Sequence, residues 1–220
     1  MIYKTNKKFK KSLYNNLISL NWFLISSLVT SLIFLSFGIR ELIDYFFPSS
    51  NDYTYDINSI QGLIFEIIQT AIFFPFLEEL GFRGWLLHKL AKRWTVKTSI
   101  ITSSILFAVI HTQDIIGSFI FGIVMCLIFI KSRTLFAPSI SHVVYNLSLV
   151  VYSYLDYNNI AISGIAVFMD TILNNYLLLT MISIISIFWI LLFIYKNWPD
   201  TNTILPYHQN KRDSANFKNQ

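Results

Sequence analysis

Two adjacent carboxylates and an arginine lie within an apolar stretch, in the segment FLEELGFR at residues 76–83. On a helix Glu79 and Arg83 would stand four residues apart on one face, a spacing that allows an ion pair, while Glu78 would point about 100° away. A carboxylate without that partner, among Phe and Leu side chains, is suited to take and give a proton. We therefore expect Glu79 and Arg83 to be structural and Glu78 to be reactive, unless both glutamates only neutralise the arginine or lie at a membrane surface.

Two histidines lie in later apolar stretches. His111 follows Phe107 by four residues, and His142 precedes Asn146 by four. At this one-turn spacing His142 and Asn146 would share a helix face and present two hydrogen-bonding groups toward one point. A single histidine in an apolar helix is more often a packed, hydrogen-bonded residue than a catalyst, so only the combination with Glu78 favours chemistry. No chemistry is assigned to Glu66, expected near the outer end of its helix, or to His88 and His208, in basic or tail sequence.

The segments that carry these residues are unusually apolar. The 220 residues are 54% hydrophobic and 13% charged, with a mean hydropathy of +0.53, whereas soluble domains are about 25% charged. Cys126 is the one cysteine, so a disulfide framework and a thiolate zinc site are excluded. The net charge of +5 comes from basic residues at segment ends, which is typical of loop sorting at a membrane and not of nucleic-acid binding.

Six apolar runs alternate with charged segments, and several are as long as a membrane-spanning helix. They cover residues 17–39, residues from 60 to the basic segment at 89–97, and residues 98–111, 115–130, 135–155 and 176–195. Placing the loops rich in Lys and Arg in the cytoplasm requires six crossings with both termini inside. The predicted fold is an all-α, polytopic membrane helical bundle of about six transmembrane helices, in a bacterial cell membrane.

The same pattern predicts three regions and the depth of the polar residues. Residues 1–16 form a basic cytoplasmic N-terminus, residues 17–195 the membrane domain with a catalytic core at about 60–155, and residues 196–220 a polar, disordered cytoplasmic tail. At 1.5 Å per residue, the depth is about 20 Å for Glu78 and His111, about 13 Å for His142 and about 19 Å for Asn146. We therefore expect polar groups from three helices to converge at one level, as proton-transfer chemistry on a peptide would need.

These residues resemble the motifs of the CPBP intramembrane protease family. That family groups CAAX prenyl endopeptidases with bacteriocin-processing and abortive-infection type proteins. The resemblance covers about residues 76–148 and rests on three ordered motifs, which are Glu78-Glu79-x-x-x-Arg83, Phe107-x-x-x-His111 and His142-x-x-x-Asn146.

The resemblance implies hydrolysis of a peptide bond by water that Glu78 activates with the help of His111. His142 and Asn146 would donate hydrogen bonds to the oxyanion, and the supporting residues would be Glu79, Arg83 and Phe107. This mechanism needs no metal, and no cofactor is favoured. A zinc ion held by His111, His142 and Glu78 is the alternative, because these residue types also bind zinc and the family is often described as a metalloprotease family.

Two other classes of function remain open. The site could capture a peptide without cleaving it, as in a bacteriocin-immunity protein, or relay protons in a coupled transporter. The transporter has less support, because the six runs contain no internal repeat. The expected partners are a peptide or membrane-protein substrate and the lipid bilayer, without nucleic acid, and the oligomeric state is left open.

Overall fold

Every regular element in the described part of the chain is a helix. The computed structural model describes residues 21–46, 59–112, 114–157 and 175–216. The helices, in which η marks a π-helix, are α2 (Trp22–Phe46), α3 (Ile60–Glu66), η1 (Ile67–Phe73), α4 (Phe74–Glu79), η2 (Leu80–Leu86), α5 (Leu87–Leu90), α6 (Val96–Ile110), α7 (Ile115–Ser132), α8 (Phe136–Tyr157), α10 (Tyr176–Asn197) and α11 (Pro206–Asn216). The predicted all-α membrane bundle is therefore confirmed.

Four helical stretches are long and apolar enough to cross a membrane, namely Trp22–Ile43, Ile60–Leu90, Ile115–Ser132 and Tyr176–Asn197. α6 is apolar but has only 15 residues, and the 22 residues of α8 include several polar side chains. All six predicted runs correspond to helices, the first from Trp22 onward, so the expected count of about six is consistent with the structure. The orientation in the membrane stays a prediction, and the basic region 1–16 lies outside the described residues.

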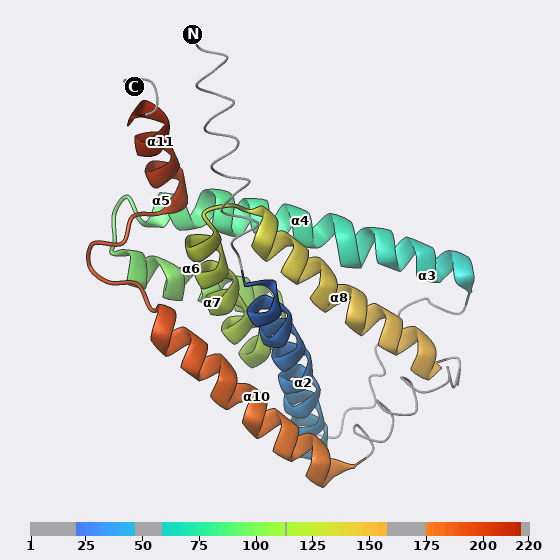
Figure 1. Cartoon of the computed structure of the whole chain (residues 1–220). Coiled ribbons are helices and arrows are strands. Elements are labelled where there is room, and N and C mark those ends of the chain that lie inside the picture. Colours follow the sequence, from blue (N-terminus) through green and yellow to red (C-terminus); the bar gives the residue numbers. More distant parts are fainter. Residues whose placement is uncertain (1–20, 47–58, 113, 158–174, 217–220) are drawn as a thin grey trace.

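The helix that carries the paired glutamates runs without a break from α3 to α5 and contains two π-helical segments, η1 and η2 (Figure 1). In η1 the hydrogen bonds join residues five apart, because the N–H of Phe74 donates to the carbonyl of Gln69. The next donor in that register would be Pro75, which has no N–H, and its acceptor would be the carbonyl of Thr70. Such π-turns are rare and often mark functional sites, and these two flank the α4 turn.

α7 lies at the centre of the bundle. Its residues 121–129 are all buried, and α2, α6, α8 and α10 pack against it. α6 approaches α7 closely at Gly122, where an added Cβ atom would lie 2.9 Å from the Cβ atom of Ser104. Small residues at both positions therefore let the two helices touch, as is common between membrane helices. The helix from α3 to α5 crosses one end of the bundle, and α8 packs along it (Figure 1).

Residues 206–216 form helix α11 in the tail that the sequence predicted to be disordered. Arg133, in the turn between α7 and α8, forms an ion pair with Asp213, and its carbonyl accepts a hydrogen bond from Nδ2 of Asn210 at 3.1 Å. Leu205, just before the helix, is buried in the core that includes α7. The expectation of disorder does not hold for these residues, because composition alone cannot indicate such contacts.

Candidate active site

The Glu79–Arg83 pair lies inside the protein. Nη1 of Arg83 donates to Oε1 of Glu79 at 2.8 Å, and the two side chains are 1% and 0% exposed. Nη2 of Arg83 donates to the carbonyl of Gly122 on α7 at 3.1 Å. The guanidinium carbon also lies 4.9 Å from the ring centre of Phe107 on α6, which is within cation–π range. Arg83 therefore joins the long helix to α6 and α7, and Glu79 balances its buried charge.

His142 on α8 connects this buried pair to Glu78. Its Nδ1 atom lies 3.0 Å from Oε1 of Glu79, and because the arginine-paired carboxylate accepts, Nδ1 is the protonated nitrogen that donates. In the neutral ring Nε2 then carries the lone pair, and it faces Oε2 of Glu78 at 3.7 Å. The ring is buried and packs against Phe121 of α7, with ring centres 4.6 Å apart. Both the orientation and the tautomer of His142 are therefore fixed by its neighbours.

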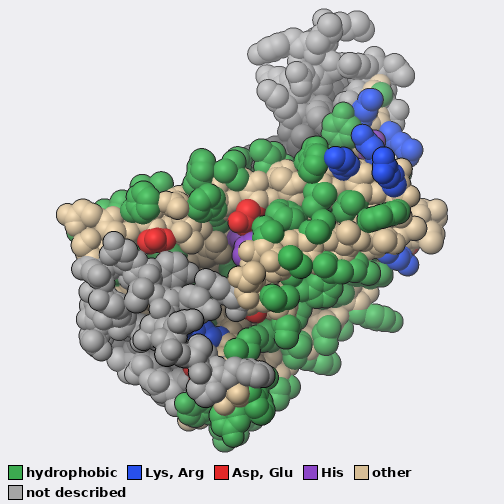
Figure 2. Space-filling view, turned by 180° about the vertical axis from the view of Figure 1, so that it is seen from behind, with side chains coloured by type: hydrophobic (Ala, Val, Ile, Leu, Met, Phe, Trp, Pro, Cys, Tyr) green, Lys and Arg blue, Asp and Glu red, His purple; other side chains and the backbone are tan. Residues whose placement is uncertain are grey.

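His111 reaches the same oxygen of Glu78 from the end of α6. Its Nδ1 atom donates to the carbonyl of Phe107 at 2.8 Å, and its Nε2 atom lies 3.7 Å from Oε2 of Glu78. The imidazole stacks on the ring of Phe107 at 4.2 Å. The side chains of His111 and Glu78 are 34% and 25% exposed, so this part of the site is accessible. Figure 2 shows acidic and histidine side chains reaching the surface together among apolar ones.

Asp114 supports the short turn that follows His111. The N–H of Asp114 donates to the carbonyl of His111 at 3.2 Å, and its carboxylate caps α7 by accepting from the N–H of Gly117 at 2.8 Å. Burial raises the pKa of Asp114, and the Gly117 N–H, the Ser36 hydroxyl and His111 offset part of that rise. The turn is therefore hydrogen-bonded at both ends, which helps to hold His111 beside Glu78.

Asn146 bonds to the long helix and has a structural role. Its Nδ2 atom donates to the carbonyl of Thr70 at 3.0 Å, the acceptor for which Pro75 provides no donor. The hydroxyl of Thr70 in turn donates to Oε2 of Glu66 at 2.7 Å. Glu66, to which the sequence assigned no chemistry, thus belongs to this contact. Asn146 satisfies a backbone group of η1 and holds α8 against it, and its second amide hydrogen is not used in that bond.

The structure brings Glu78, His111 and His142 together and places the supporting residues Glu79, Arg83 and Phe107 directly behind them. Four contributors were missed by sequence reasoning, namely Thr70, Asp114, Phe121 and Gly122. A weak signal existed for Gly122, since it is a small residue in a run of bulky ones. Thr70 could have been found only through Pro75 five residues later, once the π-register was known.

Zinc was the alternative to a metal-free site, and Glu78, His111 and His142 match it in residue type. Both histidines also use Nδ1 in a hydrogen bond and leave Nε2 for a ligand, as zinc ligands do. The 3.7 Å separations between Nε2 and Oε2 are about 0.3 Å longer than the roughly 3.4 Å between ligands of a tetrahedral zinc ion with bonds of about 2.05 Å. Among the described residues, no group of three or more His, Cys, Asp or Glu side chains is placed to hold a metal ion. Both the metal-free mechanism and the zinc alternative stay predictions.

Comparison with known proteins gives a family match for the part of the chain that carries the site. Residues 60–148 match the family model of the Rce1-like type II CAAX prenyl endopeptidases, a protease family. No curated protein and no solved structure matches the chain. The matched stretch begins with α3 and ends within α8, so it includes all the site residues described above. Residues 60–148 are thus similar to the Rce1-like type II CAAX prenyl endopeptidases, which is the CPBP family that the motifs predicted.

Proposed function

We propose that this protein is an intramembrane endopeptidase in which Glu78 activates the water that attacks a peptide bond. The observation that carries the proposal is the position of Oε2 of Glu78, which lies 3.7 Å from Nε2 of both His111 and His142. Peptide hydrolysis requires that one proton leave water and that one reach the departing amine, and a carboxylate between two imidazoles is suited to both transfers. The similarity of residues 60–148 to a protease family supports the same class of reaction.

The same separations indicate where the attacking water binds. A gap of 3.7 Å is too long for a direct hydrogen bond, but polar groups at such a distance are commonly bridged by water. A water molecule about 2.8 Å from both Oε2 and one Nε2 fits this geometry. Its oxygen forms the new bond to the carbonyl carbon while Glu78 takes a proton. Glu78 then delivers this proton to the amine as the C–N bond breaks.

His142 is the residue best placed to stabilise the oxyanion. When its ring is protonated, Nε2–H becomes a donor, and the Glu79 carboxylate 3.0 Å from Nδ1 stabilises the imidazolium charge. Asn146 lies one turn further along α8, and the amide hydrogen that is not bonded to Thr70 is its contribution. His111 holds the water and Glu78 in line.

The substrate in this proposal is an apolar or lipid-linked peptide segment. Large apolar side chains next to Glu78 on the same helix are exposed, at Phe76, Leu77 and Leu80. They favour a substrate that approaches from within the bilayer, where burial of apolar surface contributes to binding. A peptide that carries a prenyl group is one member of this class.

The test is a cleavage assay with the purified protein in proteoliposomes, using quenched fluorescent peptides with and without a prenyl group. We expect cleavage by the native protein and by Glu41→Gln, a matched carboxylate-to-amide change on α2, and none by Glu78→Gln. Binding of the peptides without cleavage by the native protein would contradict the proposal and favour a peptide-binding or immunity protein. Cleavage that persists in Glu78→Gln would show that another group is the base.

A further inference from the structure

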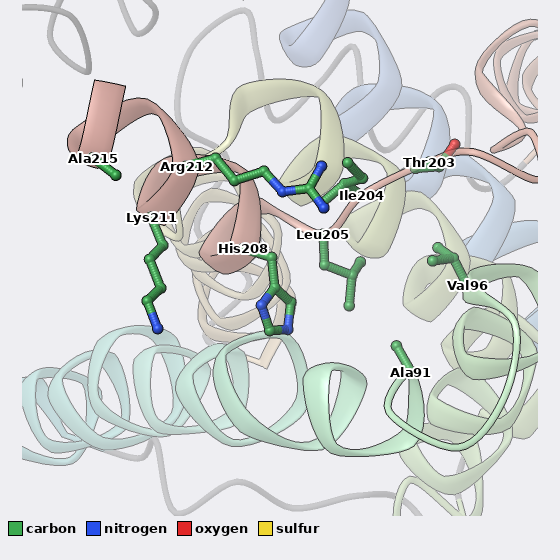
Figure 3. A pocket seen from close by; sticks show the side chains of 9 residues that line it. All are labelled: Ala91, Val96, Thr203, Ile204, Leu205, His208, Lys211, Arg212 and Ala215. Carbon is green, nitrogen blue, oxygen red and sulfur yellow. The ribbon is translucent and has the colours of Figure 1, made fainter. Parts of the chain in front are cut away.

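A second feature that could bind a ligand lies away from Glu78, between α11 and the turn that joins α5 to α6. It is a cavity of about 580 Å³ (Figure 3). Part of its lining is apolar, with Ala91 and Val96 from the turn and Leu205 from the segment before α11. The other part is basic and comes from one helix, with His208, Lys211 and Arg212. The cavity therefore combines an apolar wall with cationic side chains, and it shares no residue with the candidate active site.

The wall formed by α11 is held in place from two sides. The ion pair between Asp213 and Arg133 attaches it to the turn between α7 and α8. At its other end the N–H of Tyr207 donates to Nε2 of His88 at 3.4 Å. Nδ1 of His88 bonds in turn with the carbonyl of Arg83 at 3.1 Å. These contacts fix the cationic side chains relative to the bundle, so the cavity is part of the fold.

The surroundings of the cavity are those of a membrane surface. Trp85 and Trp94, before and within the same turn, are 59% and 49% exposed, and tryptophan is enriched where lipid headgroups meet the acyl chains. Nζ of Lys89 lies 4.4 Å from the ring centre of Trp85, an arrangement in which the amine can reach the headgroup region. Figure 2 shows a group of Lys and Arg side chains at this end of the molecule.

We propose that this cavity binds an anionic phospholipid, with the phosphate against Lys211 and Arg212 and the start of an acyl chain against Ala91, Val96 and Leu205. Basic pockets beside membrane helices attract anionic headgroups, and the attraction grows with each cationic side chain near the surface. A free phosphate ion would use only the basic part of the lining. A phospholipid uses both parts, which is why the lipid is the occupant that fits the cavity.

The experiment measures lipid binding to the full-length protein in detergent by native mass spectrometry, with phosphatidylglycerol and phosphatidylcholine of identical acyl chains. We expect selective binding of phosphatidylglycerol. The double substitution Lys211→Ala/Arg212→Ala should weaken it by about tenfold to thirtyfold, as expected for two lost surface charges. The matched control Lys92→Ala/Arg93→Ala removes the same charge from the adjacent turn without touching the cavity lining, and it should weaken binding less than about threefold.

Two further measurements separate the possible occupants. Ala91→Phe should reduce phosphatidylglycerol binding with all charges intact, because the larger side chain fills the apolar part. Soluble glycerol phosphate should compete only weakly. Equal losses in the two double variants, equal binding of the two lipids, no effect of Ala91→Phe, or full competition by glycerol phosphate or by an acidic peptide would each overturn the lipid proposal.

Discussion

Glu78 and Glu79 are adjacent in sequence, yet their side chains occupy opposite surroundings. Glu79 is 0% exposed and bonds to both Arg83 and His142, whereas Glu78 is 25% exposed and lies 3.7 Å from His111 and His142. A carboxylate that balances a buried arginine cannot be neutralised without leaving that arginine unpaired. A carboxylate with space around one oxygen can bind water and exchange protons. One turn of helix can therefore supply a fixed electrostatic support and a reactive group together.

The largest effect on turnover should come from replacing Glu78, the partly exposed carboxylate that accepts the proton. Glu78→Gln keeps the shape and the hydrogen-bonding capacity of the side chain but cannot carry the proton, so we expect turnover to fall by about 10³-fold or more. Thermal unfolding in detergent should stay near that of the native protein, because Oε2 of Glu78 lies 3.7 Å from both histidines, too far for a direct hydrogen bond. A variant that lost stability and activity together would show that the two glutamates do not differ as described.

Substitutions in the buried Glu79–Arg83 pair should instead reduce the stability of the fold. Arg83→Ala or Glu79→Gln leaves a partner as an uncompensated buried charge, which should lower the free energy of unfolding by about 3–5 kcal/mol. Folded yield and the midpoint of thermal unfolding report this loss, with Arg93→Ala, an exposed arginine, as the control. Normal yield and midpoint for both variants would mean that the pair is not needed for folding.

The two histidines should both matter for turnover, but only one of them should matter for stability. His111→Ala and His142→Ala should each lower turnover by about 10²-fold to 10⁴-fold, because both face Glu78. Only His142→Ala should also destabilise the protein, by about 1–3 kcal/mol, because it removes a buried hydrogen bond to Glu79. Equal stability of the two variants would show that the bond between His142 and Glu79 does not contribute to folding.

A pair of substitutions can separate the structural role of Asn146 from a role in the reaction. Asn146→Ala should cost about 1–3 kcal/mol of stability, since the Thr70 carbonyl loses its donor. Adding Pro75→Ala supplies a backbone N–H in the π-register and should restore most of that stability. We expect a loss of about 10²-fold to 10³-fold in turnover to persist in the double variant if the amide also serves the oxyanion. Recovery of both properties would leave Asn146 with the structural role alone.

A chelator should have the smallest effect. With water activated by Glu78 itself, 1,10-phenanthroline should leave the turnover of the purified protein largely unchanged. Inactivation that is reversed by added zinc would instead show that Glu78, His111 and His142 bind a metal ion. Glu78 would then be a metal ligand and not the base that activates water directly. The inactive Glu78→Gln protein sets the background of this assay.

Much of this arrangement could be predicted from the sequence where local geometry decides it. The bond between Glu79 and Arg83 requires only a helix and a spacing of four residues. Counting residues from the basic turn predicted that Glu78 and His111 would come together, and their side chains lie 3.7 Å apart. The all-α membrane fold follows from composition and from the length of the apolar runs in the same way.

The remaining features of the site and the fold depend on tertiary contacts, which the sequence pattern does not indicate. The Asn146 contact exists because η1 changes the hydrogen-bond register just before Pro75, and the sequence contains no clear sign of that change. Helix α11 is held by Asp213 and Arg133, residues 80 positions apart, so its composition alone suggested disorder. The Gly122 carbonyl became a partner of Arg83 only through the packing of α7.

The length of α6 has a consequence for the membrane itself. The helix ends at Ile110 after 15 residues, which is about 22 Å of helix, whereas the hydrocarbon layer is about 30 Å thick. A bilayer adapts to so short an element by thinning beside it, and the last carbonyls of the helix need partners beyond the helix itself. Such thinning would bring the lipid–water boundary inward toward His111. A hydrolase of the proposed kind would then obtain its second substrate, water, through a thinned bilayer instead of a channel through the protein.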